Sequence, residues 1–291
     1  MRVSTAMMSE TILWNVTRNA ARLDRVADQI SSGRQISRPS DDPVGTANVL
    51  QLDSTRARIQ QHLRNMNDAR SWIDATDQAL SSINASIQRA REITLAAANG
   101  TLAPENRDAI ATELQRILES AIGAANTRLN GRYIFAGQKT DTPAFGGPPN
   151  APVYQGDSGP IVRVIDVGVT ATINVTGDTA ILPTLNALAQ AHAAVVANDP
   201  NAMRAAIDAL DNAHTALLTA QARAGAIGSQ LEEQASRLEA LDLSVARLRS
   251  QIQDVDLAKA LSDYSTLQTV YQASLAAGSR SILPSLFDYL A

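Results

Sequence analysis

The chain has 291 residues, a formal net charge of −4, no cysteine and an aromatic content of only 3%. The absence of cysteine excludes disulfides and thiolate chemistry. Charges of both signs are spread along the chain, so there is no electrostatic case for a nucleic-acid partner. Much of the apolar content is alanine, a composition that favours closely packed helices over a β-sandwich or barrel.

The first residues, "MRVSTAMMSETILWNVTRNAARLD", contain no short apolar core followed by a small-residue cleavage site. We therefore expect no cleavable signal peptide. No segment approaches about 18 consecutive apolar residues, so we expect no membrane span and no membrane partner.

Two amphipathic helices are predicted at the start of the chain. The first carries a heptad stripe and ends at Gly33; its stripe residues are Leu13, Val16, Ala20, Leu23, Ala27 and Ile30. The second covers about residues 44–98, with an apolar residue at every seventh position: Leu52, Ile59, Met66, Ile73, Leu80 and Ile87. At 1.5 Å per residue this helix would be ~80 Å long.

A third helix is predicted from Pro104 to Asn130-Gly131, with an apolar stripe of Ile110, Leu114, Ile117, Ala121 and Ala125. The composition then changes, because glycine and proline cluster between residues 143 and 178 and β-branched residues alternate in "IVRVIDV" and "TATINVTG". This pattern predicts two or three short strands. Nearby aromatic residues could form a small separate core: Tyr133, Phe135, Phe145 and Tyr154.

After a short helix around 184–197, Asp199 and Pro200 are expected to begin a fourth, long helix. It carries two apolar columns. One is Leu210, Leu217, Ala224, Leu231, Leu238, Val245 and Ile252; the other is Ala213, Ala220, Ile227, Gln234, Leu241, Leu248 and Val255. The phase slips near "DVDLAKAL", and a last helix follows with a stripe of Leu257, Leu261, Tyr264, Tyr271, Leu275 and Ile282.

These elements predict a mainly α fold, in which a long antiparallel helical rod resembling a coiled-coil bundle carries a small inserted β domain at its tip. The N- and C-terminal helices are expected to pair. Three domains follow: a terminal helical domain of residues 1–40 and 254–291, a rod of 41–136 and 184–253, and a β-rich outer domain of 137–183.

The stretch "QISSGRQISRPSDDPVGTA" could suggest phosphate binding or acid–base chemistry. It lacks the strand and the Gly-Lys-Ser/Thr of a phosphate loop, and no histidine lies near its aspartates. We interpret it as a helix start, with Ser40 as the cap, Asp41 and Asp42 beside the positive end of the dipole, and Pro43 in the first turn. The three histidines are scattered, so neither a metal site, a cofactor nor a catalytic residue is expected.

The terminal helices each need a partner for their apolar stripe. Residues 1–35 hold five basic and three acidic side chains, or +2, and residues 254–291 hold two and four, or −2, which favours pairing modestly. Two helices cannot bury each other all round, so an assembly interface is predicted at Leu13, Trp14, Val16, Leu23, Ile30, Leu257, Leu261, Tyr264, Tyr271, Leu275 and Ile282. The alternative is a self-contained bundle that does not assemble.

Several segments together resemble the flagellin superfamily: "ISSGRQISRPSDDPVG" near the N-terminus, "RAGAIGSQLE" at 223–232 and "DVDLAKALSDYSTLQTVYQASLAAGSRSI" at 254–282. Three others resemble its hook-associated relatives at the hook–filament junction: "LNGRYIFAGQKTDTPAF", "YQGDSG" and the ending "LPSLFDYLA".

The resemblance implies a non-enzymatic structural subunit that joins hook and filament outside the cell. It implies export through the flagellar type III apparatus and four kinds of partner: copies of itself, a hook-associated protein on the hook side, flagellin on the filament side and an export chaperone. Flagellin itself is the alternative within the family. A rod that uses its β domain as an adhesin is a further alternative, and an enzyme is the remotest.

Overall fold

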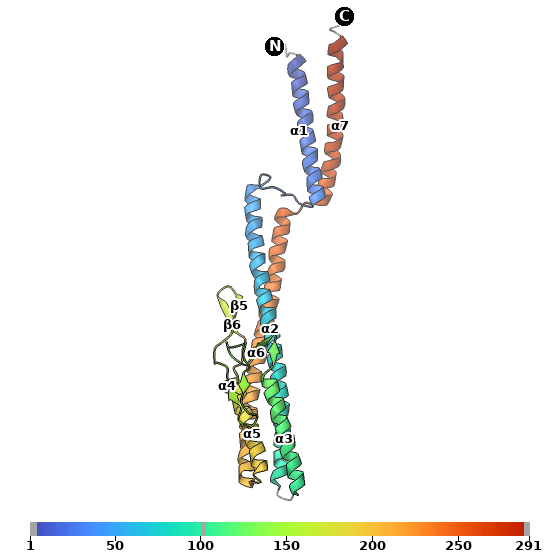
Figure 1. Ribbon diagram of the computed structural model, residues 1–291. Helices are drawn as coiled ribbons and strands as arrows, with labels where there is room; N and C mark the ends of the chain where they lie inside the picture. The colour runs from blue at the N-terminus through green and yellow to red at the C-terminus, as the bar shows by residue number, and fades with distance from the viewer. Residues whose placement is uncertain (1–4, 100–102, 288–291) are drawn as a thin grey trace. The chain divides into compact units, whose positions relative to one another are not determined.

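The computed structural model describes residues 5–99 and 103–287. Seven helices lie within these residues (Figure 1): α1 (Thr5–Ser32), α2 (Pro43–Ala98), α3 (Pro104–Ala125), α4 (Gly177–Ala180), α5 (Leu182–Val196), α6 (Pro200–Gln253) and α7 (Leu257–Phe287). Six short strands form three antiparallel pairs: β1 (Arg128–Leu129) with β2 (Arg132–Tyr133), β3 (Phe145–Gly146) with β4 (Val153–Tyr154), and β5 (Val162–Asp166) with β6 (Val169–Thr172). The predicted mainly α class with a small β insertion is confirmed.

The chain divides into two compact units, described separately below. Unit 1 contains residues 1–58 and 241–291, and unit 2 contains residues 59–240. These boundaries fall inside α2 and α6, whereas the three predicted domains were bounded by breaks between the predicted helices and by the change in composition around the β-rich segment. The three-domain division stays a prediction.

The central helices of unit 2 run antiparallel, as polar contacts between α2 and α6 show. Arg91 Nε lies 2.6 Å from Asp211 Oδ1, and Arg70 Nη1 lies 3.4 Å from Glu232 Oε1. Residue numbers therefore rise along α2 as they fall along α6. These ion pairs are largely exposed, so each contributes only about 0–1 kcal/mol, and they fix register more than stability.

The core of unit 2 is built from the heptad positions that the sequence indicated. The side chains of α2 at every seventh position from Ile59 to Ile87 are buried, and so is the first column of α6 as far as Leu238. Helices α3 and α5 pack against each other, and each contributes buried leucines to this core. Burial of these apolar side chains removes surface from water, which is the main stabilising contribution in such a bundle.

The α4–α5 stretch, Gly177–Val196, is long and apolar enough to cross a membrane by length and composition alone. More than half of it is buried inside the protein, including Leu185, Leu188 and Val195. Packing within the helical core therefore accounts for its apolar composition.

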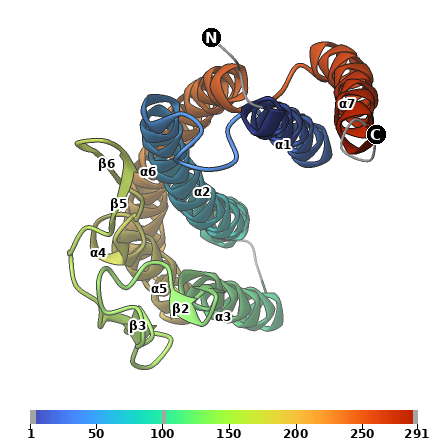
Figure 2. The same cartoon turned by 90° about the horizontal axis from the view of Figure 1, so that it is seen from above.

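The β-rich segment lies beside α2 and α6 rather than at the end of a rod, which corrects the predicted placement at the tip. Asn65 Nδ2 on α2 donates a 2.8 Å hydrogen bond to the carbonyl oxygen of Val164, and Gln234 Nε2 on α6 donates a 2.6 Å bond to Asp166 Oδ2. Figure 2 shows the β5–β6 hairpin at the side of these helices. Because Asn65 stands 33 residues before Ala98, the hairpin is held about 50 Å along α2 from that end.

Gln234 is the one polar residue in the two predicted columns of α6, and its burial has a structural reason. Its side chain is 8% exposed and binds Asp166, so the position anchors the hairpin instead of packing in the apolar core. Leu241 and Leu248, the next members of that column, are exposed. The second column therefore faces the core only over part of its length.

Asn130-Gly131 is a hairpin turn and not a helix end, which corrects the predicted extent of the third helix. Helix α3 ends at Ala125, and Asn130 and Gly131 have φ angles of 51° and 80° between strands β1 and β2. A two-residue hairpin turn needs positive φ at both central residues to match the twist of its strands, and Asn-Gly adopts this conformation readily. By contrast, the predicted start of α6 is confirmed, because Asp199 Oδ1 accepts a 2.8 Å bond from the backbone N–H of Asn201.

The predicted aromatic cluster forms the core of the β-rich segment. Phe135 is fully buried, Tyr133 and Phe145 are buried, and the rings of Phe145 and Tyr154 lie 5.4 Å apart. The hydroxyl of Tyr154 lies 3.0 Å from the carbonyl oxygen of Phe135 and 2.7 Å from that of Asp157. Both acceptors are fixed by the backbone, so the phenol is held in its neutral, donating form.

This environment predicts a pH effect at Tyr154. Burial, followed by the negative charge of Asp178, raises the pKa of Tyr154 to about 12 from 10.0. The unfolded chain therefore loses this proton at lower pH than the folded chain, so stability is complete below pH 10 and falls between pH 10 and about 12. We expect urea unfolding to show this loss. The difference in unfolding free energy between the wild type and Tyr154→Phe should shrink across that window; a constant difference would contradict the assignment.

Candidate assembly interface

The terminal helices α1 and α7 of unit 1 pack side by side in antiparallel orientation. Gly278 faces Ile12 so closely that a Cβ atom at Gly278 would lie 3.0 Å from Ile12 Cγ2. The contact face, called the seam here, has the alternating three- and four-residue spacing of a coiled coil. On α1 its buried or half-buried members are Ile12, Val16, Asn19, Leu23, Val26 and Ile30, and on α7 they are Ala260, Tyr264, Leu267, Tyr271, Ser274 and Gly278.

The structure divides the predicted interface residues into two groups. Five of them lie half-buried in the seam: Val16, Leu23, Ile30, Tyr264 and Tyr271. Five others are exposed large apolar side chains: Leu13, Trp14, Leu257, Leu261 and Leu275. The last one, Ile282, belongs to α7, but its side chain lies outside the described residues.

The exposed leucines of α7, called the α7 ridge here, lie on one face of the helix: Leu257 and Leu261 are one turn apart, and Leu275 follows about 21 Å farther along. Their separations are close to whole numbers of helical turns, so the three side chains share one face, next to the seam. Leu261 is 55% exposed, and its two companions are similarly uncovered. Single exposed leucines are common on monomeric proteins, but three on one face of a helix mark a candidate contact surface.

On α1, Trp14 is 59% exposed and lies one heptad after the exposed Met7. The guanidinium of Arg18 stands 4.9 Å from the centre of the Trp14 ring, a cation–π contact on the surface. Sequence reasoning missed Met7 and the exposed Val270, because neither belongs to the stripe that was followed. A helical-wheel projection of all residues of each helix would have placed these two apolar residues outside the main stripe.

Among the residues whose side chains the structure describes, the opposite net charges of the two terminal segments do not form ion pairs across the helix pair. In the part of the chain that the structure describes, no ion pair joins α1 to α7; the one ion pair made by α1 is with the connector, between Asp28 Oδ2 and Arg38 Nη2 at 3.9 Å. Both side chains are largely exposed, so this contact stabilises the connector only slightly. Apolar packing in the seam is therefore the main stabilising contact between the two helices.

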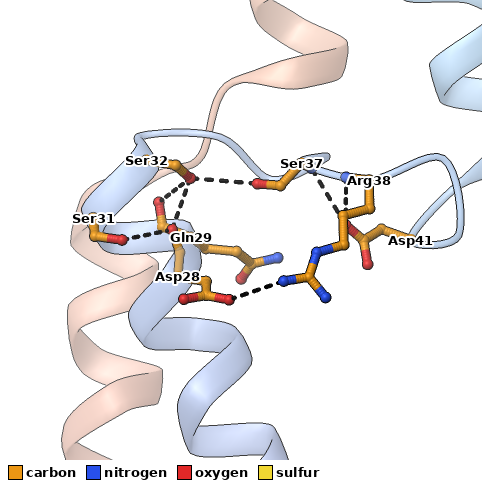
Figure 3. A network of polar contacts seen from close by, with 7 residues as sticks. All are labelled: Asp28, Gln29, Ser31, Ser32, Ser37, Arg38 and Asp41. Atoms are coloured by element: carbon orange, nitrogen blue, oxygen red, sulfur yellow. Dashed lines mark hydrogen bonds and ion pairs between the residues drawn. The ribbon is translucent and has the colours of Figure 1, made fainter.

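The connector from Gly33 to Asp42 folds back over the end of α1 (Figure 3). Ser32 Oγ donates to the carbonyl oxygen of Asp28 at 2.7 Å and lies 3.4 Å from Ser37 Oγ. Gly33, with a φ angle of 68°, lets the chain leave the helix in the left-handed conformation. Asp41 Oδ2 accepts a 2.9 Å bond from the backbone N–H of Arg38, which closes the turn.

This connector is also bonded to the chain between α6 and α7. The backbone N–H of Gln35 donates to the carbonyl oxygen of Gln253 at 2.7 Å, and the N–H of Val255 donates to the carbonyl oxygen of Gly33 at 3.0 Å. Arg34 and Asp254 form an isolated antiparallel bridge between these bonds. The two chain segments that link the terminal helices to the long helices are thus hydrogen-bonded to each other.

The cap of α2 is Asp42 and not Ser40, which corrects the predicted assignment. Helix α2 begins at Pro43, and Asp42 Oδ1 accepts bonds of 3.0 and 2.9 Å from the backbone N–H groups of Val44 and Gly45. Ser40 stands too early to reach these donors. The interpretation of "DDP" as structural holds: Asp41 accepts the hydrogen bond that closes the turn, and Asp42 caps α2.

Asp42→Ala is expected to reduce the unfolding free energy by roughly 0.5–2 kcal/mol, because two backbone donors of the first turn lose their acceptor. Asp42→Asn keeps an acceptor and is the matched control. Chemical denaturation measures both; an Asp42→Ala variant as stable as the wild type would show that water replaces the cap without cost.

Three comparisons with known proteins agree with this geometry. Residues 3–140 match the bacterial flagellin N-terminal helical region, and residues 207–290 match the bacterial flagellin C-terminal helical region. Flagellar hook-associated protein 3 of Escherichia coli is 28% identical, over 95% of this chain and 96% of the relative. A flagellin of Bacillus subtilis is 26% identical over 95% of this chain and 94% of the relative.

Among solved structures, one described as a flagellar hook-associated protein from Vibrio parahaemolyticus superposes with a TM-score of 0.69 and 26% identity. It covers 74% of this chain and 100% of its own. The family matches include all of α1, the connector, α2, α3 and α7, and most of α6. The chain therefore belongs to the flagellin superfamily, and it resembles that superfamily's hook-associated protein 3 over almost its whole length.

Proposed function

We propose that this chain is a structural subunit of the bacterial flagellum that forms the junction between hook and filament. The observation that carries the proposal is the α7 ridge, a line of uncovered leucines on paired terminal helices in a chain of this superfamily. Covering these side chains with neighbouring subunits removes apolar surface from water at ~25 cal/mol per Å². The protein acts in this role by self-assembly and not by catalysis.

The proposed partners follow from the place of such a subunit. Copies of the chain form the junction, a hook-associated protein adjoins it on the hook side, and flagellin adjoins it on the filament side. The chain reaches the outside of the cell through the flagellar export apparatus. Before assembly an export chaperone covers the C-terminal region, where the exposed Leu257, Leu261 and Leu275 would otherwise promote aggregation.

The terminal helices are proposed to gain most of their order on assembly. A lone pair of helices with a half-buried seam is marginal in water, whereas packing into a ring would cover both faces. Circular dichroism of the dilute full-length chain should then show proportionately less helix than a fragment of residues 42–253. More helix in the full-length monomer would contradict this coupling.

The second candidate is a filament subunit, because a flagellin matches over a similar length. Abundance separates the two roles: a junction protein is present in few copies for each flagellum, and a filament protein in thousands. Immunogold labelling of isolated flagella distinguishes them, since the junction role predicts label only where hook meets filament.

Deletion of the gene followed by electron microscopy of the cell surface tests the proposal. Cells are expected to carry hooks without filaments and to shed flagellin into the medium, and a plasmid copy should restore filaments. Normal filaments on the deletion strain would overturn the junction role, and loss of flagellin itself from the medium would point to the filament role.

A further inference from the structure

A cavity of about 260 Å³ lies between α2 and the β-rich segment of unit 2. Helix α2 contributes Trp72 to its lining, and strand β2, the loop after it and the chain entering β5 contribute the other residues: Arg132, Gln138, Thr140, Pro160, Ile161 and Arg163. All of them belong to the same compact unit. The lining thus contains two cationic side chains and no acidic one.

The charges of the two arginines are not compensated within the described parts of the chain. Arg132 forms neither an ion pair nor a side-chain hydrogen bond there, and Arg163 forms only a 3.3 Å bond to the carbonyl oxygen of Val162. Asp68, one turn before Trp72 on α2, is exposed and pairs with no cation among the described residues. Both guanidinium groups are therefore available to a negatively charged ligand.

The indole of Trp72 adds a donor that the fold does not use. Trp72 is 5% exposed, and its Nε1 is buried without a hydrogen-bond acceptor among the described residues. A buried N–H that lacks an acceptor is unfavourable, and such groups in folded proteins are rare. Because an indole can only donate, the group that satisfies it must accept a hydrogen bond. An anion with several oxygen atoms meets this requirement as well as the charge of the arginines.

The wall opposite α2 is held in place by hydrogen bonds of its own. Gln138 Nε2 donates to the carbonyl oxygen of Pro160 at 3.1 Å, and the backbone N–H of Gln138 donates to Asp157 Oδ1 at 2.7 Å. The carbonyl oxygen of Thr140 accepts a 2.8 Å bond from the backbone N–H of Tyr133. These bonds fix the loop around the cavity before any ligand enters, which lowers the entropy that binding must overcome.

We propose that this cavity binds a phosphate group, recognised by Arg132, Arg163 and Trp72. A planar guanidinium donates two parallel hydrogen bonds to an oxyanion, and two guanidinium groups match the charge of about −2 on a phosphate better than the single charge of a carboxylate. The cavity is smaller than the roughly 300–1,000 Å³ of sites for drug-sized ligands, so only the phosphate group itself is enclosed. The site is separate from the terminal helices and does not depend on the role proposed above.

Tryptophan fluorescence tests the site, because the chain has two tryptophans and Trp14 lies in unit 1. The full-length Trp14→Phe variant is titrated with inorganic phosphate at an ionic strength held constant with sodium chloride, and the emission of Trp72 should change with saturation. In this background Arg132→Gln should raise the dissociation constant at least about tenfold, because charged hydrogen bonds are lost. Arg116→Gln, at an exposed arginine of α3 outside the lining, should leave it unchanged. A response without saturation, or equal weakening by both substitutions, would overturn the proposal.

Thermal unfolding of the full-length chain, followed by circular dichroism, provides the second test. A ligand that binds only the folded chain raises Tm, and the rise should be smaller in Arg132→Gln and in Trp72→Phe, which keeps an aromatic ring but lacks the N–H donor. Inorganic phosphate and glycerol 3-phosphate are compared at equal ionic strength. A rise with both identifies a phosphate group as the part recognised, and a rise with inorganic phosphate alone identifies the free ion. No rise beyond that in chloride, or a rise of wild-type size in both variants, would contradict the proposal.

Discussion

Cells that produce the Leu261→Asp variant are expected to lose filaments to the same extent as the deletion strain, although the variant itself folds. Leu261 is 55% exposed on the α7 ridge, so a carboxylate there is solvated in the monomer and changes the unfolding free energy by no more than about 0.5 kcal/mol. In the assembled junction the same carboxylate must be buried against a neighbouring subunit. An unpaired buried charge costs several kcal/mol at each contact, which is enough to prevent assembly.

Thr269→Asp is the matched control for this variant. Thr269 is an exposed residue of the same helix, outside both the seam and the α7 ridge, so the same charge should leave assembly unchanged. Swimming assays and electron microscopy measure the outcome, and export of each variant into the medium shows that the protein reaches the cell surface. Wild-type motility with Leu261→Asp would remove the α7 ridge from the interface.

Phe135→Ala is expected to have the largest effect on the stability of unit 2, a loss of roughly 3–5 kcal/mol in unfolding free energy. The ring is fully buried, and the surrounding backbone is fixed by two bonds to its carbonyl oxygen, from Gly177 N–H at 3.0 Å and from the Tyr154 hydroxyl at 3.0 Å. These bonds restrict the collapse of the segment, so a cavity remains where the ring was.

Leu218→Ala provides the comparison within unit 2, because this apolar residue is 44% exposed and its truncation should cost well under about 1 kcal/mol. Urea unfolding followed by circular dichroism measures both variants. A Phe135→Ala variant that unfolds at the wild-type urea concentration would show that the β-rich segment contributes little to the cooperative unit.

The long helices could be predicted closely from the sequence because their heptad pattern repeats over many turns. The α2 positions from Ile59 to Ile87 are buried as expected, and helices predicted at about 44–98 and from Asp199-Pro200 begin and end within a residue or two of α2 and α6. The residue that caps α2 could not be identified from the sequence. "SDDP" contains three possible caps in a row, and only geometry selects Asp42.

The terminal helices show where periodicity reaches its limit. Leu261 and Tyr264 are both apolar and one turn apart, yet Tyr264 lies in the seam and Leu261 is exposed. A helix that packs on one neighbour in the monomer and on others in an assembly is apolar on more than one face. The sequence pattern therefore reports the sum of these contacts and cannot assign each residue to one of them.

The position of the β-rich segment could not be predicted because it depends on two long-range polar contacts. Asn65 looks like an ordinary surface residue in the sequence, and Gln234 looks like the one polar member of an apolar column. Only the folded chain places them against Val164 and Asp166. Strands of two residues, such as β3, also give too short a pattern to be recognised by alternation.

The most direct test of this account is whether a chain without its terminal helices still builds the junction. A gene encoding only residues 41–253, fused to an export signal recognised by the flagellar apparatus, is expressed in the deletion strain. In a parallel culture of the same strain, the full-length chain is expressed with the same fusion. The full-length copy should restore filaments, and the shortened chain should be secreted but leave bare hooks. Filaments of normal length on cells that make only the shortened chain would contradict the claim that the uncovered apolar surfaces of α1 and α7 drive assembly.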